Sequence, residues 1–116
     1  MSSPVNIDLD ALPEIKSYAA TVTSGGSVNL TDTGSSYERL PEGVSTISVS
    51  SHQSTLWVYL ATTGSASARY LTKETTPGTT TVIPNVAVPK GAVRYMQIRA
   101  DTACDVGVTI ITYPLA

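Results

Sequence analysis

The feature that most constrains the fold of this chain is a repeated alternation between short strand-favouring runs and chain breaks. Between residues 15 and 113, runs rich in Thr, Val, Ile and Tyr alternate with breaks rich in Gly, Pro, Asn, Asp and Ser. The first group of residues favours β-strands and the second favours turns. Breaks spaced about 8–12 residues apart are typical of a β-sandwich or a barrel. The sequence therefore predicts an all-β fold without interior helices.

This pattern divides the chain into about eight expected strands. Their ranges are 16–23, 27–32, 44–51, 55–62, 66–74, 82–89, 92–100 and 105–113. Eight antiparallel strands in 116 residues fit a single β-sandwich of the jelly-roll or Greek-key type. We therefore predict an extended N-terminal arm over residues 1–14 and a β-sandwich domain over residues 15–116.

The breaks also predict how the strands are connected. Ser24-Gly25-Gly26 indicates a tight hairpin turn, because glycine readily adopts the positive φ that such turns need. His52 is expected in another hairpin turn, and residues 31–39 are interpreted as a polar stretch between strands. Pro77-Gly78 predicts a turn. The prolines within 82–89 cannot donate to a strand ladder, so this run is expected at a sheet edge.

The run at 55–62 is apolar on both of its faces. One face carries Leu56, Val58 and Leu60, and the other carries Trp57, Tyr59 and Ala61. Apolar residues on both faces predict a central strand that is covered twice. The second sheet covers one face, and a sandwich of this size has no helices to cover the other. We therefore expect a homo-oligomer, a dimer or a trimer, with Trp57 and Tyr59 on the self-association face.

The N-terminal segment differs from the rest in pattern and in charge. Residues 1–14 keep neither a strand period nor an unbroken helix period, and they hold three acidic residues and no basic one. Fully extended, such an arm reaches on the order of 45 Å. Its apolar residues have no evident place in the core, and its aspartates favour a cationic surface. We expect it to contact a larger assembly through Val5, Ile7, Asp8, Leu9, Asp10 and Leu12.

No pattern of residues predicts a catalytic, cofactor or metal site. A catalytic triad would depend on His52, the one histidine, and no carboxylate spacing identifies metal ligands around it. Cys104 is the single cysteine, so it forms no disulfide within the chain and is expected to be a small apolar residue beside a turn. We therefore predict that the protein is not an enzyme.

The charge balance and hydropathy argue against two other classes of partner. The net charge of −2 and the absence of a basic run disfavour binding to a nucleic-acid backbone. No apolar run approaches the length of about 18 residues that a membrane span needs, and no secretory signal pattern is present. We expect neither nucleic acid nor membrane among the partners.

The whole pattern resembles the small virion proteins of tailed bacteriophages, and capsid decoration (cement) proteins most closely. The segments that carry this resemblance are Leu-Pro-Glu-Gly-Val (40–44), Thr-Leu-Trp-Val-Tyr-Leu-Ala (55–61) and Val-Thr-Ile-Ile-Thr-Tyr-Pro (108–114). The resemblance implies assembly in the host cytoplasm and a final location on the outer surface of the capsid. It also implies that the partner is the major capsid protein, whose lattice the chain would decorate and stabilise.

A second function remains open on the sequence alone. A receptor-binding or glycan-binding β-sandwich of a phage tail or fibre would have the same composition. Such a module is expected to show aromatic and polar side chains gathered into one patch. The seven aromatic residues, one Trp and six Tyr, are numerous enough to form a patch of this kind.

Overall fold

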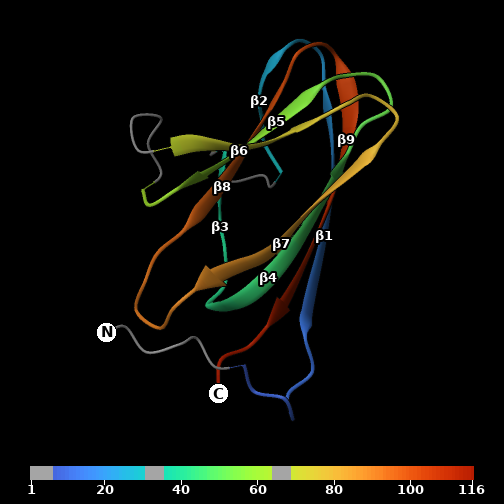
Figure 1. Ribbon diagram of the computed structural model, residues 1–116. Helices are drawn as coiled ribbons and strands as arrows, with labels where there is room; N and C mark the ends of the chain where they lie inside the picture. The colour runs from blue at the N-terminus through green and yellow to red at the C-terminus, as the bar shows by residue number, and fades with distance from the viewer. Residues whose placement is uncertain (1–6, 31–35, 64–68) are drawn as a thin grey trace.

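A computed structural model describes residues 7–30, 36–63 and 69–116 of the chain. In this part of the chain all regular secondary structure is β-strand, and the strands form two antiparallel sheets that face each other (Figure 1). The predicted all-β sandwich is therefore confirmed.

The first sheet has four strands in the order β1-β9-β4-β7. Their bounds are β1 Glu14–Val22, β9 Cys104–Tyr113, β4 Gly43–Ser50 and β7 Thr80–Val88. The second sheet has the order β2-β8-β5-β6, and β3 also pairs with β8. Their bounds are β2 Gly26–Val28, β8 Tyr95–Ala100, β5 Leu56–Ala61, β6 Arg69–Thr75 and β3 Tyr37–Arg39.

The strand pairing gives the sandwich a jelly-roll topology. Four pairings are β1 with β9, β4 with β7, β5 with β6, and β8 with both β2 and β3; the pairs β4–β9 and β5–β8 join them into the two sheets, and all are antiparallel. The short strands β2 and β3 pair with successive parts of β8, so together they occupy one strand position. Consecutive strands usually lie in opposite sheets, which is the wrapping expected of a double-sheet jelly roll. Of the two topologies that the sequence allowed, the structure has the first.

The core lies between the two sheets and is built from alternate residues of the strands. Fully or nearly fully buried side chains include Ile47, Val49, Leu56, Val58, Met96, Ile98, Val106, Val108 and Ile110. Alternation along each strand turns these side chains toward the opposite sheet. Cys104 begins β9 and is also buried in this core.

Two connections that the sequence predicts as hairpin turns instead carry the chain from one sheet to the other. Ser24-Gly25-Gly26 links β1 to β2, which lie in different sheets, so the hairpin prediction is wrong. Gly26 has a φ of 135°, and a Cβ atom at Gly25 would lie 2.4 Å from the backbone oxygen of Asp101. The glycines are therefore needed for the crossing and for its close approach to the β8–β9 connection. The segment around His52 likewise links β4 to β5 in opposite sheets.

The sequence misses one short strand but correctly predicts a turn, an edge strand and a central strand. The polar stretch 31–39 contains a strand, β3, that period alone does not reveal because it is only three residues long. Thr79 N donates to Thr76 O at 3.1 Å around Pro77-Gly78, which confirms the predicted turn. Strand β7 lies at an edge, as its prolines predict, and β5 lies between β6 and β8, as its two apolar faces predict.

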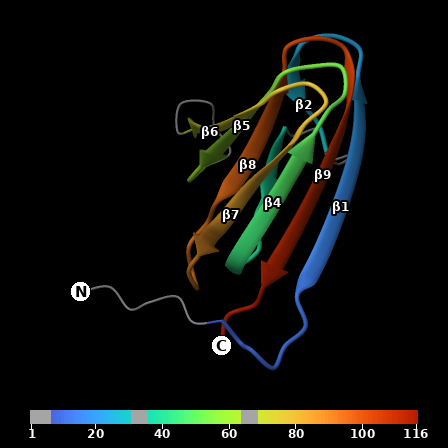
Figure 2. The same ribbon diagram turned by 45° about the vertical axis from the view of Figure 1, so that its right-hand side comes forward.

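The first described residues and the C-terminus lie at the same end of the sandwich (Figure 2). Ile7 forms an isolated antiparallel bridge with Leu115, and Asp8 N donates to Pro114 O at 2.8 Å. Strand β1 then begins at Glu14, one residue before the predicted domain boundary. Residues 7–13 therefore connect the bridge at Leu115 to the start of β1, at one end of the four-stranded sheet.

Candidate functional site

Of the residues that the sequence assigns to the arm, Ile7 and Asp8 lie beside the C-terminal residues, to which their backbone is anchored. Asp10 N donates to Asp8 Oδ1 at 3.0 Å, and Ala11 N donates to Asp8 O at 3.3 Å, so the chain turns here. Val5 lies outside the described residues.

The arm presents large apolar side chains to solvent. Leu9 is 91% exposed and Leu12 is 89% exposed. Two more apolar residues follow at the same end of the paired strands β1 and β9, with Ile15 63% and Tyr113 42% exposed. These four residues, called the terminal patch below, make up more than half of the seven exposed large apolar residues in the described part of the chain.

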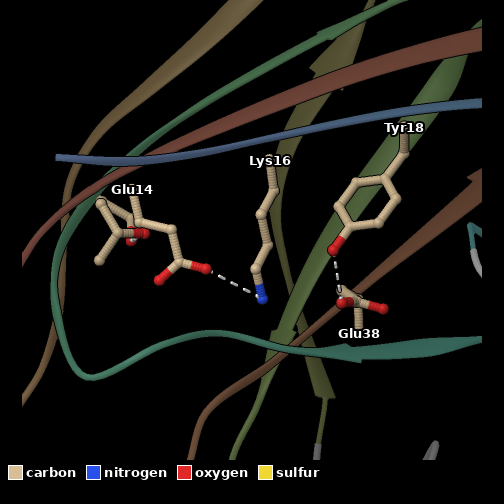
Figure 3. Close-up of polar contacts among 6 residues, drawn as sticks. Glu14, Lys16, Tyr18 and Glu38 are labelled. Carbon is tan, nitrogen blue, oxygen red and sulfur yellow. Dashed lines mark hydrogen bonds and ion pairs between the residues drawn. The ribbon is translucent and has the colours of Figure 1, made fainter.

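The second region is polar and lies between β1 and the segment around β3 (Figure 3). The Tyr18 hydroxyl donates to Glu38 Oε1 at 2.8 Å, and Lys16 Nζ lies 3.4 Å from Glu14 Oε1. Burial and the bond to Glu38 raise the pKa of Tyr18 to about 12. A pocket of about 350 Å³ is lined by Glu14, Lys16, Glu38, Arg39, Leu40, Pro41, Glu42 and Ala92. Its charges are mixed, so it favours no single ligand class.

The third region is the face of the five-stranded sheet that points away from the core, called the outer face below. Trp57 and Tyr59 lie on it, as the sequence predicts, and both are half-buried. The Arg69 guanidinium carbon lies 4.4 Å from the centroid of the Tyr59 ring. This is the geometry of a cation–π contact.

A buried amide positions Arg69 on the outer face. Gln97 is only 4% exposed, and its Oε1 accepts a hydrogen bond from Arg69 Nη1. Gln97 Nε2 donates to Ser27 Oγ at 3.3 Å and to Ser36 Oγ at 2.9 Å. Arg99 Nη1 also donates to Ser27 Oγ, at 3.1 Å. The Gln97 amide and the Ser27 and Ser36 hydroxyls thus form a network of neutral groups. Arg69 and Arg99 are hydrogen-bonded to this network.

No motif in the sequence singles out Arg69, Gln97 or Arg99 as binding residues. Alternation along β8 places Gln97 and Arg99 on the face opposite to the buried Met96 and Ile98, so this part of the cluster has a sequence signal. Arg69 has no such signal. Its position depends on the register of β6 against β5, which shifts at an irregularity between Val58 and Tyr59.

The apolar outer residues of β5 are partly covered by the chain itself. Ala61 is 1% exposed, and Arg69 lies over Tyr59. The second apolar face of β5 therefore does not by itself require a second subunit. Self-association through Trp57 and Tyr59 stays a prediction.

The segment around His52 has a structural role. His52 is exposed, whereas the flanking Ser51 and Ser54 are buried. Ser54 Oγ accepts hydrogen bonds from Asp101 N at 3.0 Å and Thr102 N at 3.1 Å. Ser51 Oγ accepts one from Gln53 N at 3.3 Å. The Ser54 hydroxyl thus ties two connections together at one end of the sandwich, whereas the Ser51 hydroxyl bonds within its own segment. The abundance of serine in the sequence hides this role.

In the described residues no group of three or more His, Cys, Asp or Glu side chains is arranged to hold a metal ion. The same residues contain no helix of the length and apolarity that crossing a membrane requires. Known family models, curated proteins and solved structures give no match to this chain.

Proposed function

We propose that the protein is a non-enzymatic structural component of a bacteriophage particle. In this proposal it decorates and stabilises the capsid by binding the outer surface of the major capsid protein lattice through its terminal patch. The observation that carries the proposal is the exposure of Leu9 and Leu12 on a segment whose backbone is anchored at Ile7 and Asp8. The capsid as partner comes from the resemblance in sequence.

Burial of the terminal patch would supply the binding energy. Burying apolar surface is favourable by about 25 cal/mol for each Å² removed from water. Two leucines that are almost fully exposed can therefore contribute substantially to the binding free energy. The anchored backbone also reduces the entropy lost on binding. Asp8 and Asp10 beside the leucines favour a cationic site on the partner. Many weak contacts on a lattice hold through multivalency.

The test is co-sedimentation of purified protein with capsids of its phage assembled without it. We expect the double variant Leu9→Ser, Leu12→Ser to lose at least tenfold in occupancy while its circular dichroism stays unchanged. Leu71→Ser is the matched control, because Leu71 is 54% exposed on β6, outside the terminal patch.

Two results would count against the proposal. Equal occupancy of the double variant and the wild type would show that the terminal patch is not the attachment surface. Absence of binding by the wild-type protein to these capsids would reject the capsid as partner.

A further inference from the structure

The outer face concentrates positive charge in a chain whose net charge is negative. Three of the four arginines lie on it: Arg39 opposite Tyr95, Arg69 opposite Ala61 and Arg99 opposite Trp57. The acidic residue placed on this face by register is Glu74, also opposite Trp57. The outer face therefore carries an excess of positive charge, although the whole chain has a net charge of −2.

Arg69 is fixed in place by neutral groups. Its guanidinium contacts the Tyr59 ring and donates to the amide oxygen of Gln97. Among the described residues the one ion pair is between Lys16 and Glu14, away from this face. An arginine has five N–H donors, and the bond to Gln97 uses one of them. Among the described residues, Arg69 therefore has no acidic partner, and its orientation is set by the Tyr59 ring and the Gln97 amide.

The neighbouring side chains define what could bind beside Arg69. Trp57 is half-buried and lies on the same face of β5 as Tyr59. Arg99, opposite Trp57, is held by Ser27 and is also partly exposed. An indole ring offers a large flat surface against which the C–H face of a sugar ring can pack. A guanidinium binds a carboxylate through paired hydrogen bonds.

We propose that the outer face binds a carboxylate-bearing saccharide. Arg69 binds the carboxylate, Arg99 supplies a second cationic contact, and Trp57 packs against the sugar ring. Gln97 is a positioning residue, because it acts on the ligand through Arg69. The site lies on the sheet that does not contain β1 or β9, so it is separate from the terminal patch and independent of capsid attachment.

The observations favour this ligand over a second copy of the chain. In a two-fold interface between copies the same surface of each copy meets, so the positive charge of the outer face would oppose itself. The centre of the outer face is occupied by Arg69, Gln97 and Arg99, the apolar Ala61 is already buried within the chain, and the exposed aliphatic residue that register places there is Leu71, opposite Tyr59. A single fixed guanidinium next to an aromatic ring instead matches a ligand with one carboxylate and one apolar face.

Trp57 is the only tryptophan in the chain, so its fluorescence reports directly on the site. The probes are oligosaccharides that contain galacturonate, glucuronate or N-acetylneuraminate, each paired with a neutral counterpart lacking the carboxylate. We expect at least one acidic probe to change the Trp57 emission and to bind in calorimetry. The neutral counterpart should bind at least tenfold more weakly.

Substitutions connect binding to the proposed residues. Arg69→Gln should reduce the affinity for the acidic probe at least tenfold. Arg69→Lys should restore it only in part, because lysine keeps the charge but lacks the paired donors. Arg94→Gln is the matched control, because it removes the same charge from a residue that donates to the Val93 carbonyl and lines a pocket with Ile83 and Pro84. It should leave the affinity unchanged.

Three results would overturn the proposal. The first is that no acidic probe binds. The second is that Arg69→Gln and Arg94→Gln weaken binding equally, which would indicate nonspecific attraction. The third is an emission change that follows protein concentration instead of saccharide, together with dimers or trimers in sedimentation that Arg69→Gln dissociates. That result would assign the outer face to a second copy.

Discussion

At the scale of single residues, Ser54 links two connections at one end of the sandwich. Its hydroxyl accepts hydrogen bonds from Asp101 N and Thr102 N, and it also donates to Thr55 O at 2.8 Å. Ser54→Ala removes the acceptor, and Asp101 N keeps a second acceptor in Thr55 O. We therefore predict a loss of about 1–2 kcal/mol in the free energy of unfolding.

Denaturant unfolding of Ser54→Ala and Ser17→Ala checks this prediction. Ser17 is an exposed serine of β1, so its substitution should change the free energy of unfolding by less than about 0.5 kcal/mol. Equal values for the two variants would show that the hydroxyl of Ser54 does not hold the connections together.

Tyr18 gives a second residue-scale prediction, on the dependence of stability on pH. Its pKa rises from 10.0 to about 12 in the folded protein, through burial and the bond to Glu38. The folded state therefore holds this proton more tightly than the unfolded state. The resulting stabilisation is complete below about pH 10 and is lost as the pH rises through about 12.

Near-ultraviolet absorbance titration measures this ionisation. We expect Tyr18→Phe to remove a step at about pH 12, and Glu38→Gln to move that step to lower pH. Its contribution to stability should be visible as a difference between wild type and Tyr18→Phe that shrinks between pH 10 and 12. A step that persists in Tyr18→Phe would assign it to another group.

At the scale of strands and turns, the sequence predicts local features well and connections poorly. Alternation predicts the inward side of β4 from Ile47 and Val49, because side-chain direction depends only on neighbouring residues. It does not predict that β1 pairs with β9, since that pairing joins residues as distant as Glu14 and Thr112. A glycine turn looks the same in a hairpin and in a crossing between sheets, which is why Gly25 and Gly26 are misread.

Gly43, at the start of β4, tests the importance of such a glycine. Its φ is 134°, and a Cβ atom there would lie 2.3 Å from the backbone oxygen of Tyr113. Gly43→Ala combines backbone strain with a collision against β9, so we predict a loss of about 2–4 kcal/mol. Gly78 also has a positive φ, of 80°, but open space around it. Gly78→Ala should cost about 1–2 kcal/mol.

Thermal and denaturant unfolding of the two variants measure the loss of stability in each. Backbone strain contributes to both losses, and the collision with Tyr113 contributes only to that of Gly43→Ala. Gly43→Ala should be clearly the less stable of the pair. If both variants lost the same amount, the close approach of Gly43 to Tyr113 would contribute nothing to the stability.

At the scale of the whole molecule, the candidate surfaces were only partly predictable. The arm residues could be selected because an acidic and apolar segment has no place in a period-2 core. The cluster around Arg69 could not, because it depends on β5, β6 and β8 lying side by side with one particular register. Association of the isolated chain into dimers or trimers also stays a prediction, which sedimentation velocity measures.

The first described residues lie beside the C-terminal residues, but the two segments contribute to the fold in very different ways. The described arm residues are joined to the sandwich by the bridge between Ile7 and Leu115 and by the bond from Asp8 N to Pro114 O. Strand β9, in contrast, pairs with both β1 and β4 and contributes three of its valine and isoleucine side chains to the core. We therefore predict that deletion of residues 2–12 lowers the free energy of unfolding by less than about 2 kcal/mol. Deletion of residues 104–116 should prevent folding.

Circular dichroism and thermal unfolding of the two truncated proteins test this asymmetry. The protein without residues 2–12 should keep the β-sheet spectrum and a cooperative transition, while the protein without residues 104–116 should show neither. This outcome is required if the arm is to be an attachment device, because its side chains must be free to leave solvent for a partner surface. Unfolding on deletion of the arm would instead make Leu9 and Leu12 part of the folded unit, and the terminal patch would lose its role in attachment.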